Sequence, residues 1–335
     1  MLLLFITIII SLILILILHL YFSKHYWYKV HQQLQKNPSQ NKFFTNSKFN
    51  NNSIFITSVS QLNPSQFNSL YKNYLPSFSI TTSSAQKFLQ FMPNPSIIIK
   101  KLNEKYIGSV FNCLTTIHFK NSIQKILFVD YAVINHLHRH QNIFQGLMNN
   151  IALYANKNNC NSIFFKIDLK PIPSFSQYKF ISNYFLTTSK KLSNINPTNF
   201  PIIPANPNDI QINCFFNNLK LFPTKDLLQC ILQTGWGYKI NNKIVILGKN
   251  NSPVNAEILY IIFLEKTNQK DLKNLFECFL SYLGKTSQNI MIDNIGFNIL
   301  MVESCREYWE ELHRTYHYMV GFEGDVKRED FYYYF

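Results

Sequence analysis

The segment that most constrains the fold is residues 123 to 155, where an apolar run passes through a short polar turn into an amphipathic pattern. Residues 126 to 134 are almost all apolar or aromatic, and the run is too short and too rich in β-formers for a core helix. From residue 143 the apolar side chains follow helical spacing, with Ile143, Leu147 and Ile151 on one line. The change of period predicts a central strand and then a helix that begins near Gln141, which is an α/β arrangement.

The turn between this strand and this helix has the chemistry of an anion site. The first N–H groups of a helix have no partner within it, and the positive end of the helix dipole lies there, which suits a pyrophosphate. Arg139 stands in the turn and adds a positive charge. An ordinary strand, turn and helix of an α/β core has the same pattern, so the pattern alone leaves both interpretations open.

Composition indicates a chain that binds anionic partners. The 335 residues include 47% hydrophobic residues and carry a net charge of +14, spread over scattered lysines without blocks of like charge. This favours a CoA-type co-substrate or a membrane surface, and the lack of a basic and aromatic repeat disfavours nucleic acid. The six cysteines form no CxxC pair, which favours a reducing compartment and disfavours a zinc site or a disulfide framework.

The amino-terminal segment has the length and polarity of a transmembrane helix. Residues 2 to 22 are apolar except for three positions, and Lys24 and Lys29 follow directly. The positive charges predict a single-pass membrane anchor at residues 1–23, with the soluble domains facing the cytosol. A cleaved signal peptide is the alternative, but the basic region and small-residue cleavage site that it needs are missing. Residues 24–53 are polar and predict a juxtamembrane linker.

The rest of the chain reads as two related α/β halves. Residues 54–193 form the first predicted domain, with helices at 62–75 and 83–91, strands at 97–102, 106–117 and 124–134, a helix at 142–156 and a strand at 162–167. A turn is expected at Asn103 and Glu104. Residues 194–210 contain four prolines and predict a linker. Residues 211–335 form the second predicted domain, with strands at 238–247 and 257–264, a helix at 271–283 and a strand at 289–293.

Several blocks, in collinear order, resemble one known family. The run from Ile107 to Met148, which includes IGSVFNCLTTIHFKNSIQKILFVDYAV, is similar without a gap to the central segment of the N-myristoyltransferase family. The blocks SLYKNYLP (69–76), AQKFLQFM (85–92), LKPIPSFSQYKFIS (169–182) and the closing FYYYF also resemble family blocks. That family consists of tandem acyl-CoA N-acyltransferases of the GNAT superfamily. The resemblance therefore implies an α/β (α+β) fold of two tandem GNAT-like domains, here behind the amino-terminal transmembrane helix.

The resemblance also implies a donor, an acceptor and a set of site residues. The donor is myristoyl-CoA or another acyl-CoA, and the acceptor is an amine, such as the amino-terminal glycine of a protein. Two backbone N–H groups that hold the thioester oxygen in the family correspond to Tyr131 and Ala132. The basic CoA clamp corresponds to Arg139, His140, Gln141 and Asn142, of which only Arg139 keeps a full charge. The rest of the expected acyl-CoA cradle is Val133, Ile134, Ile143 and Phe144.

Two departures from the family leave the catalytic base open. The family's acidic loop is absent between residues 75 and 83, and the chain stops at Phe335, before the segment that returns the family's terminal carboxylate to the active site. The base is the Phe335 carboxylate, or Asp130 beside the expected oxyanion site, or it is absent. The alternative functions are a general GNAT acetyltransferase and an inactive membrane-tethered scaffold that binds lipid or peptide.

Two histidine patterns raise the question of a metal. His136, His138 and His140 alternate in the turn after the central strand, but no carboxylate or cysteine partner is evident, so solvated turn histidines are favoured over a metal site. His313 and His317 have the spacing of a zinc metalloprotease helix, but Arg314 stands where its glutamate is required. The sequence therefore predicts no metal cofactor.

Overall fold

The computed structural model describes most of the two predicted halves. The described residues are 10–15, 54–58, 61–63, 65–66, 94–119, 122–139, 141–168, 179–205, 221–223, 236–249, 256–265, 267–287, 289–322 and 326–330. Residues 10 to 15 are helical, and the rest of the predicted anchor lies outside these ranges. No helix in the described part of the chain combines the length and the apolar character needed to cross a membrane.

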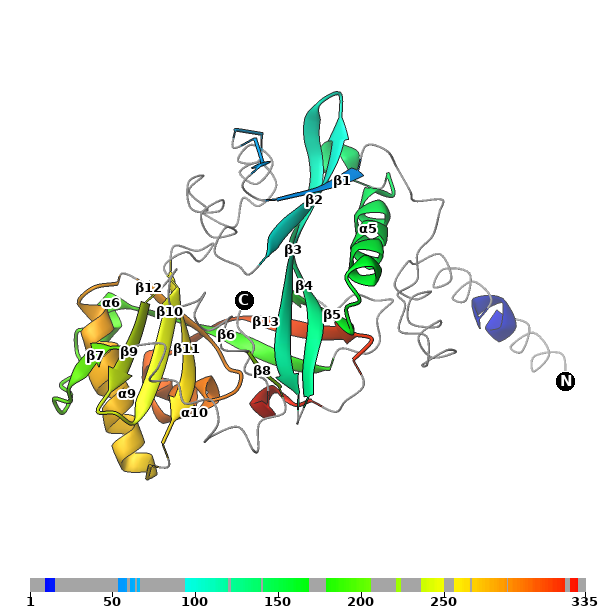
Figure 1. Ribbon diagram of the computed structural model, residues 1–335. Coiled ribbons are helices and arrows are strands. Elements are labelled where there is room, and N and C mark those ends of the chain that lie inside the picture. Colours follow the sequence, from blue (N-terminus) through cyan, green and yellow to red (C-terminus); the bar gives the residue numbers. More distant parts are fainter. Residues whose placement is uncertain are drawn as a thin grey trace, which may run out of the picture.

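The first half builds a mostly antiparallel sheet around the predicted strand, turn and helix (Figure 1). Its elements are β1 (Ile54–Ser58), β2 (Pro95–Leu102), β3 (Lys105–Phe119), β4 (Ser122–Ile134), the short 3-10 helix η3 (His136–His138), α5 (Ile143–Lys157), β5 (Ser162–Asp168), β6 (Phe180–Thr188) and α6 (Ser189–Leu192). Asn103 and Glu104 both have positive φ and close the β2–β3 hairpin, as two-residue hairpin turns require. The predicted turn there is confirmed.

The second half repeats the order of hairpin, strand, helix and strand. Its elements are β7 (Ile202–Pro204), β8 (Leu221–Pro223), β9 (Trp236–Ile240), β10 (Ile244–Lys249), β11 (Glu257–Leu264), α9 (Gln269–Gly284), β12 (Asn289–Asp293), α10 (Asn298–Ser304), η6 (Arg306–Tyr308), β13 (Glu310–Val320) and η7 (Arg328–Asp330). The side chain of Asn268 caps α9 by accepting a hydrogen bond from the N–H of Asp271 at 2.8 Å.

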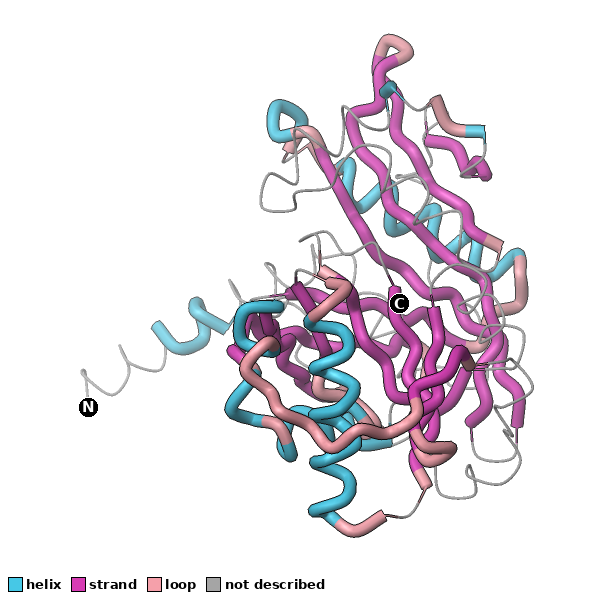
Figure 2. Tube along the Cα trace, turned by 90° about the vertical axis from the view of Figure 1, so that its left-hand side faces the viewer, coloured by secondary structure: helices cyan, strands magenta, loops and turns pink. Residues whose placement is uncertain are grey.

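All described strands belong to one sheet, which runs through both halves (Figure 2). The order is β1-β2-β3-β4-β5-β13-β6-β12-β11-β10-β9-β7, with β8 pairing β3. Two pairs of neighbours are parallel, β4 with β5 and β11 with β12, one pair in each half. The last long strand, β13, lies between β5 and β6 and pairs antiparallel with both. A strand from the end of the chain thus closes the gap between two strands of the first half.

Helices α5 and α9 cover the same face of this sheet. Residues that pair across neighbouring strands have their side chains on the same face of the sheet. Phe165 of β5 pairs with Tyr318 of β13, and the pairing of β13 with β6 places Phe185 of β6 on that same face. Phe165 and Tyr318 belong to the core under α5, whereas Phe185 belongs to the core under α9. The opposite face of the central strands therefore carries a different set of side chains, and the candidate site includes that face.

Three sequence predictions need correction or remain open. The predicted strand at 238–247 is wrong, because Asn241 and Asn242 adopt positive φ and divide it into β9 and β10. Part of the predicted linker 194–210 is the strand β7, which pairs with β9. The helices predicted at 62–75 and 83–91 lie almost wholly outside the described residues. The domain limits stay predictions.

Candidate functional site

A β-bulge lies at Tyr131 and Ala132. In the β3–β4 ladder Val133 pairs with Ser109 and Asp130 pairs with Phe111, so two residues of β4 stand opposite Val110 alone. A bulge takes one residue out of the ladder and re-aims the local backbone. It also reverses which residues face α5: Leu127 and Val129 pack in the α5 core before the bulge, and Ile134 packs against that core after it.

The bulge coincides with the point where two parallel strands separate. β4 pairs with β5 only from residue 126 to residue 129. Beyond that point β5 continues alongside β13, and β4 continues alongside β3 as far as Ile134. The backbone at Tyr131 and Ala132 therefore lies on the edge of β4 where β5 has departed, which is where an added ligand can meet backbone N–H groups.

The amino terminus of α5 follows one short turn later. Asn142 occupies the left-handed region with φ of 57° and makes no side-chain hydrogen bond to the helix. Its carbonyl accepts the first helical bond, from the N–H of Gly146 at 3.0 Å. No acidic side chain lies in the first turn. The N–H groups of the first turn thus keep their capacity to bind an anion, and the anion site itself stays a prediction.

The predicted site residues are collected along one stretch of backbone. Asp130 to Ile134 lie in β4, Arg139 is exposed at the end of η3, and Gln141, Asn142, Ile143 and Phe144 form the entry to α5. Gln141 Oε1 lies 3.3 Å from His138 Nδ1. Asp130 is directed to the face of β4 away from α5, because it pairs with Phe111. His140 and Phe335 lie outside the described residues. No three metal-ligating side chains come together in the described ranges.

A groove of about 680 Å³ runs beside this turn. Its lining comes from the β2–β3 hairpin, from η3 and from the first short helical residues, and includes Leu102, Lys105, Tyr106, Asn135, Leu137 and His138. Leu137 is 71% exposed and Leu102 is 46% exposed. The groove is large enough for a ligand, and its lining mixes exposed apolar side chains with polar and charged ones.

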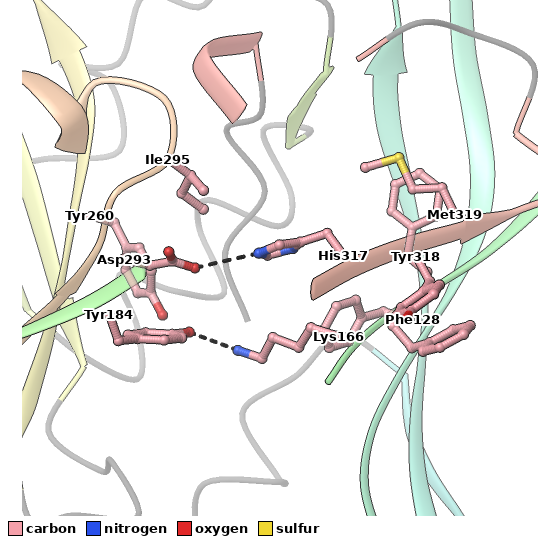
Figure 3. Close-up of a pocket in the computed structure, with 11 residues that line it drawn as sticks. Phe128, Lys166, Tyr184, Tyr260, Asp293, Ile295, His317, Tyr318 and Met319 are labelled. Carbon is pink, nitrogen blue, oxygen red and sulfur yellow. Dashed lines mark hydrogen bonds and ion pairs between the residues drawn. The ribbon is translucent and has the colours of Figure 1, made fainter. Parts of the chain in front are cut away.

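A second, buried pocket lies at the centre of the sheet (Figure 3). Its polar side chains lie on the face away from α5 and α9, because they alternate along their strands with residues of the cores under these helices. Its cavity measures about 20 Å³, which is room for about one water-sized group. Lys166 and His317 reach from β5 and β13 toward Tyr184, Tyr260 and Asp293 on the other side. The Nζ of Lys166 donates to the hydroxyl of Tyr184 at 2.9 Å. The Nε2 of His317 lies 3.8 Å from Asp293 Oδ2.

Neighbouring groups hold the polar side chains of this pocket in place. The hydroxyl of Ser182 lies 2.7 Å from His317 Nε2, and the ring of Phe180 stacks on the imidazole at 4.4 Å. The buried Asn298 side chain accepts from the N–H of Ile261 at 2.8 Å and donates to the carbonyl of Asp293 at 2.9 Å. These bonds fix the end of β12, and so the carboxylate, against β11.

Burial and nearby charges both shift the pKa of the Tyr260 hydroxyl. Burial raises the pKa of its hydroxyl above the ordinary value, the negative charges of Asp293 and Asp130 raise it further, and the positive charge of Lys166 lowers it. The Tyr260 hydroxyl therefore stays protonated and can donate a hydrogen bond. The effect of Asp130 also shows that this carboxylate belongs to the same electrostatic neighbourhood as the pocket.

This pocket was not predicted from the sequence. The spacing of His313 and His317 suggests a metalloprotease helix, whereas the segment is β13. A signal was present: Thr315, His317 and Met319 alternate with Tyr316, Tyr318 and Val320, a period of two in β-branched and aromatic residues. The pattern predicts a strand but not its neighbours, and only those neighbours bring Lys166 and Ser182 to the histidine.

This chain is similar to known proteins in structure but not in sequence. No family model matches the chain, and no curated protein matches it in sequence. Solved structures do match. Saccharomyces cerevisiae N-myristoyltransferase with bound myristoyl-CoA superposes with a TM-score of 0.60 at 11% identity, over 83% of this chain and 85% of that one.

A second solved structure is similar in fold. A Pyrococcus horikoshii protein described as a putative acetyltransferase superposes with a TM-score of 0.59 at 8% identity, over 86% of this chain and 96% of that one. Identities this low carry information on the fold alone. The mixed α/β part of the expected fold class is thereby confirmed for the residues that the structure describes, whose fold is similar to those of N-myristoyltransferase and of the Pyrococcus protein. The division into two tandem domains and the membrane anchor stay predictions.

Proposed function

We propose that this chain is an acyl-CoA-dependent N-acyltransferase that transfers an acyl group from the thioester to an amine. The observation that carries the proposal is the bulge at Tyr131 and Ala132, at the point where β4 and β5 separate and one turn before the amino terminus of α5. Backbone N–H groups on that edge would then bind the thioester carbonyl. The fold likeness supports this proposal.

The chemistry needs no covalent intermediate. The amine attacks the thioester carbonyl, the C–N bond forms, the C–S bond breaks, and CoA leaves as a thiol while the amine loses a proton. The backbone N–H groups at the bulge would stabilise the oxyanion, a contribution of about 10²- to 10³-fold in rate per donor in enzymes of this kind. Since backbone donors supply it, the tyrosine and alanine side chains at this position are no obstacle.

The finer features of the proposal concern the donor, the acceptor and the membrane. We infer that the first turn of α5 holds the CoA phosphates with help from Arg139, and that the groove beside η3 takes part of the donor. A myristoyl donor and an amino-terminal glycine acceptor would follow if the likeness to N-myristoyltransferase extends to substrate. Residues 1–23 would then anchor the enzyme at a membrane, with the catalytic part facing the cytosol.

The test is binding of acyl-CoA to the full chain in a nonionic detergent, with acetyl-CoA, myristoyl-CoA and free CoA compared. Tighter binding of myristoyl-CoA supports the long-chain donor, and preference for acetyl-CoA supports a general GNAT acetyltransferase. Arg139→Gln should weaken binding by about 2- to 5-fold, because an exposed charge contributes little. Lys157→Gln is the matched control at the other end of α5, and it should change nothing.

Two outcomes contradict the proposal at different levels. If the full chain binds none of the three ligands, the acyltransferase proposal is wrong. If it binds acyl-CoA but transfers the acyl group to no amine, the inactive scaffold is the better description.

A further inference from the structure

We propose that the central pocket receives the amino group of the acceptor and that His317 removes its proton. This inference rests on the proposed function and adds the acceptor side of the same site. The pocket adjoins the bulge along β4, because Phe128 lines it and Tyr131 follows three residues later. It also begins where the parallel strands separate, because Lys166 follows Phe165, the last residue of β5 that pairs with β4.

The pocket matches a primary amine in size and in hydrogen-bonding groups. Its volume of about 20 Å³ admits one water-sized group, which is the size of an amino group and not of a whole substrate. Three polar groups meet there: the Nε2 of His317, the Oδ2 of Asp293 at 3.8 Å from it, and the Oγ of Ser182, which shares a 2.7 Å hydrogen bond with Nε2. Nε2 accepts from an amine once the Ser182 hydroxyl turns away from it. A protonated amine has three N–H donors. The 3.8 Å separation is longer than a hydrogen bond, so an N–H group that enters between the imidazole and the carboxylate can donate to both.

Lys166 prepares the amine for attack. It is the cross-strand neighbour of His317, and its ammonium group stays in the pocket on the Tyr184 hydroxyl. A nearby positive charge disfavours a second one, so it lowers the pKa of an amine bound beside it. The Lys166 cation disfavours a bound ammonium group and favours the neutral amine. The neutral amine is the nucleophilic form that acyl transfer needs.

The proton steps balance as follows. The bound ammonium gives one proton to His317, and the imidazolium is stabilised by the Asp293 carboxylate. The neutral amine attacks the thioester carbonyl, the C–N bond forms and the C–S bond breaks. The nitrogen then loses its second extra proton to solvent, and the His317 imidazolium gives its proton to the leaving sulfur, so CoA departs as a thiol and His317 is neutral again.

The titration of this site involves the charged and titratable groups around it in the described part of the chain. These groups are Asp130 of β4, Lys166 of β5, Tyr184 of β6, Tyr260 of β11, Asp293 of β12, and Tyr318 and His313 of β13; the His313 ring lies 5.0 Å from that of Tyr184. Asp130 is the competing base, since it faces the same side of the sheet. A variant of each candidate separates the two.

The experiment measures thiol release by the full chain, with myristoyl-CoA and a short peptide that begins with glycine, as a function of pH. His317→Gln should keep its affinity for acyl-CoA while kcat falls on the order of 10²- to 10⁴-fold. Its remaining rate should rise with pH through the pKa of the peptide's own amino group, about 8. Lys166→Gln should shift the pH profile of the enzyme upward by about one unit. Lys285→Gln, an exposed lysine after α9, is the matched control and should shift nothing.

Asp293→Asn supplies a second comparison if His317→Gln does not fold, since it removes the charge that stabilises the imidazolium and should lower kcat at unchanged acyl-CoA affinity. A His317→Gln enzyme with the wild-type rate and pH profile would overturn the inference. The inference would also be wrong if the pH–rate profile lost its acid limb in Asp130→Asn but kept it in His317→Gln. Binding of acyl-CoA without any transfer also overturns it. Failure to bind acyl-CoA at all refutes the proposed function instead.

Discussion

Gly108 offers a direct test of how α5 is seated over the site. It lies in β3 opposite Ile134, beneath the first turn of the helix. A Cβ at this position would lie 3.1 Å from Cγ2 of Ile143, 3.5 Å from Cδ1 of Leu147 and 3.5 Å from the carbonyl oxygen of Val133. The first distance is tighter than ordinary contact, so any side chain here moves the helix entry relative to β4. The glycine therefore sets the spacing between the predicted phosphate-binding turn and the bulge.

The change to make is Gly108→Val, which adds a side chain where the structure has no room. Overpacking of this kind costs about 1–3 kcal/mol of unfolding free energy. Ile143→Ala removes the side chain in the way, which is 7% exposed, and costs about 2–5 kcal/mol alone through the cavity it leaves. Because the valine would fill that cavity, the double variant should be less destabilised than the sum, by about 1–3 kcal/mol.

Urea unfolding at equal m-values measures this coupling, and acyl-CoA titration of the folded variants measures its effect on the site. Gly108→Val should weaken acyl-CoA binding, and Ile143→Ala added to it should restore part of the affinity. The matched control combines Ile143→Ala with Gly248→Ala, which lies in the other half. The losses of unfolding free energy from these two substitutions should add. Additivity of Gly108→Val and Ile143→Ala within about 0.5 kcal/mol would refute the idea that this contact seats the helix.

Three further predictions address other parts of the chain. Gly248→Ala should destabilise the protein by about 2–3 kcal/mol, because its Cβ would overlap the ring of Trp236 across the β9–β10 pair; urea unfolding measures the loss, and the folded fraction should bind acyl-CoA as before. The hydrogen bond from Lys273 lowers the pKa of Glu307, so the pair stabilises the fold above the ordinary carboxyl pKa and the stabilisation disappears as pH falls through the lowered value. Since both groups are largely exposed, Glu307→Gln should cost under about 1 kcal/mol at neutral pH and nothing in acid, as unfolding curves at both pH values would show. Burial raises the pKa of the Cys160 thiol to about 11, so at pH 8 a maleimide should modify Cys160 only after denaturation; labelling in the native protein, read by peptide mass spectrometry, would contradict this.

The donor side of the site was predictable because its signals are local. The change from an apolar run to helical spacing predicted β4 and α5, and the predicted start at Gln141 differs from the observed one at Ile143 because Asn142 adopts φ of 57° and cannot belong to the helix. The bulge itself has no such signal. Apart from Asp130, apolar and aromatic residues occupy both faces of β4 here, so the reversal of facing between Val129 and Ile134 leaves no clear trace in the alternation.

The acceptor side was beyond prediction because its residues meet only through non-local pairing. Lys166, Ser182 and His317 each occupy an ordinary inward position of a strand, and nothing in the sequence around any of them specifies that β13 lies between β5 and β6. Inserting a strand from the end of the chain into the first half also has a consequence for mechanism. The bulge and α5 come entirely from the first half, whereas Asp293 and His317 come from the second. If the proposed chemistry holds, the first half alone could bind a donor but would lack the base, so donor binding and proton removal are joined only when the whole sheet has formed.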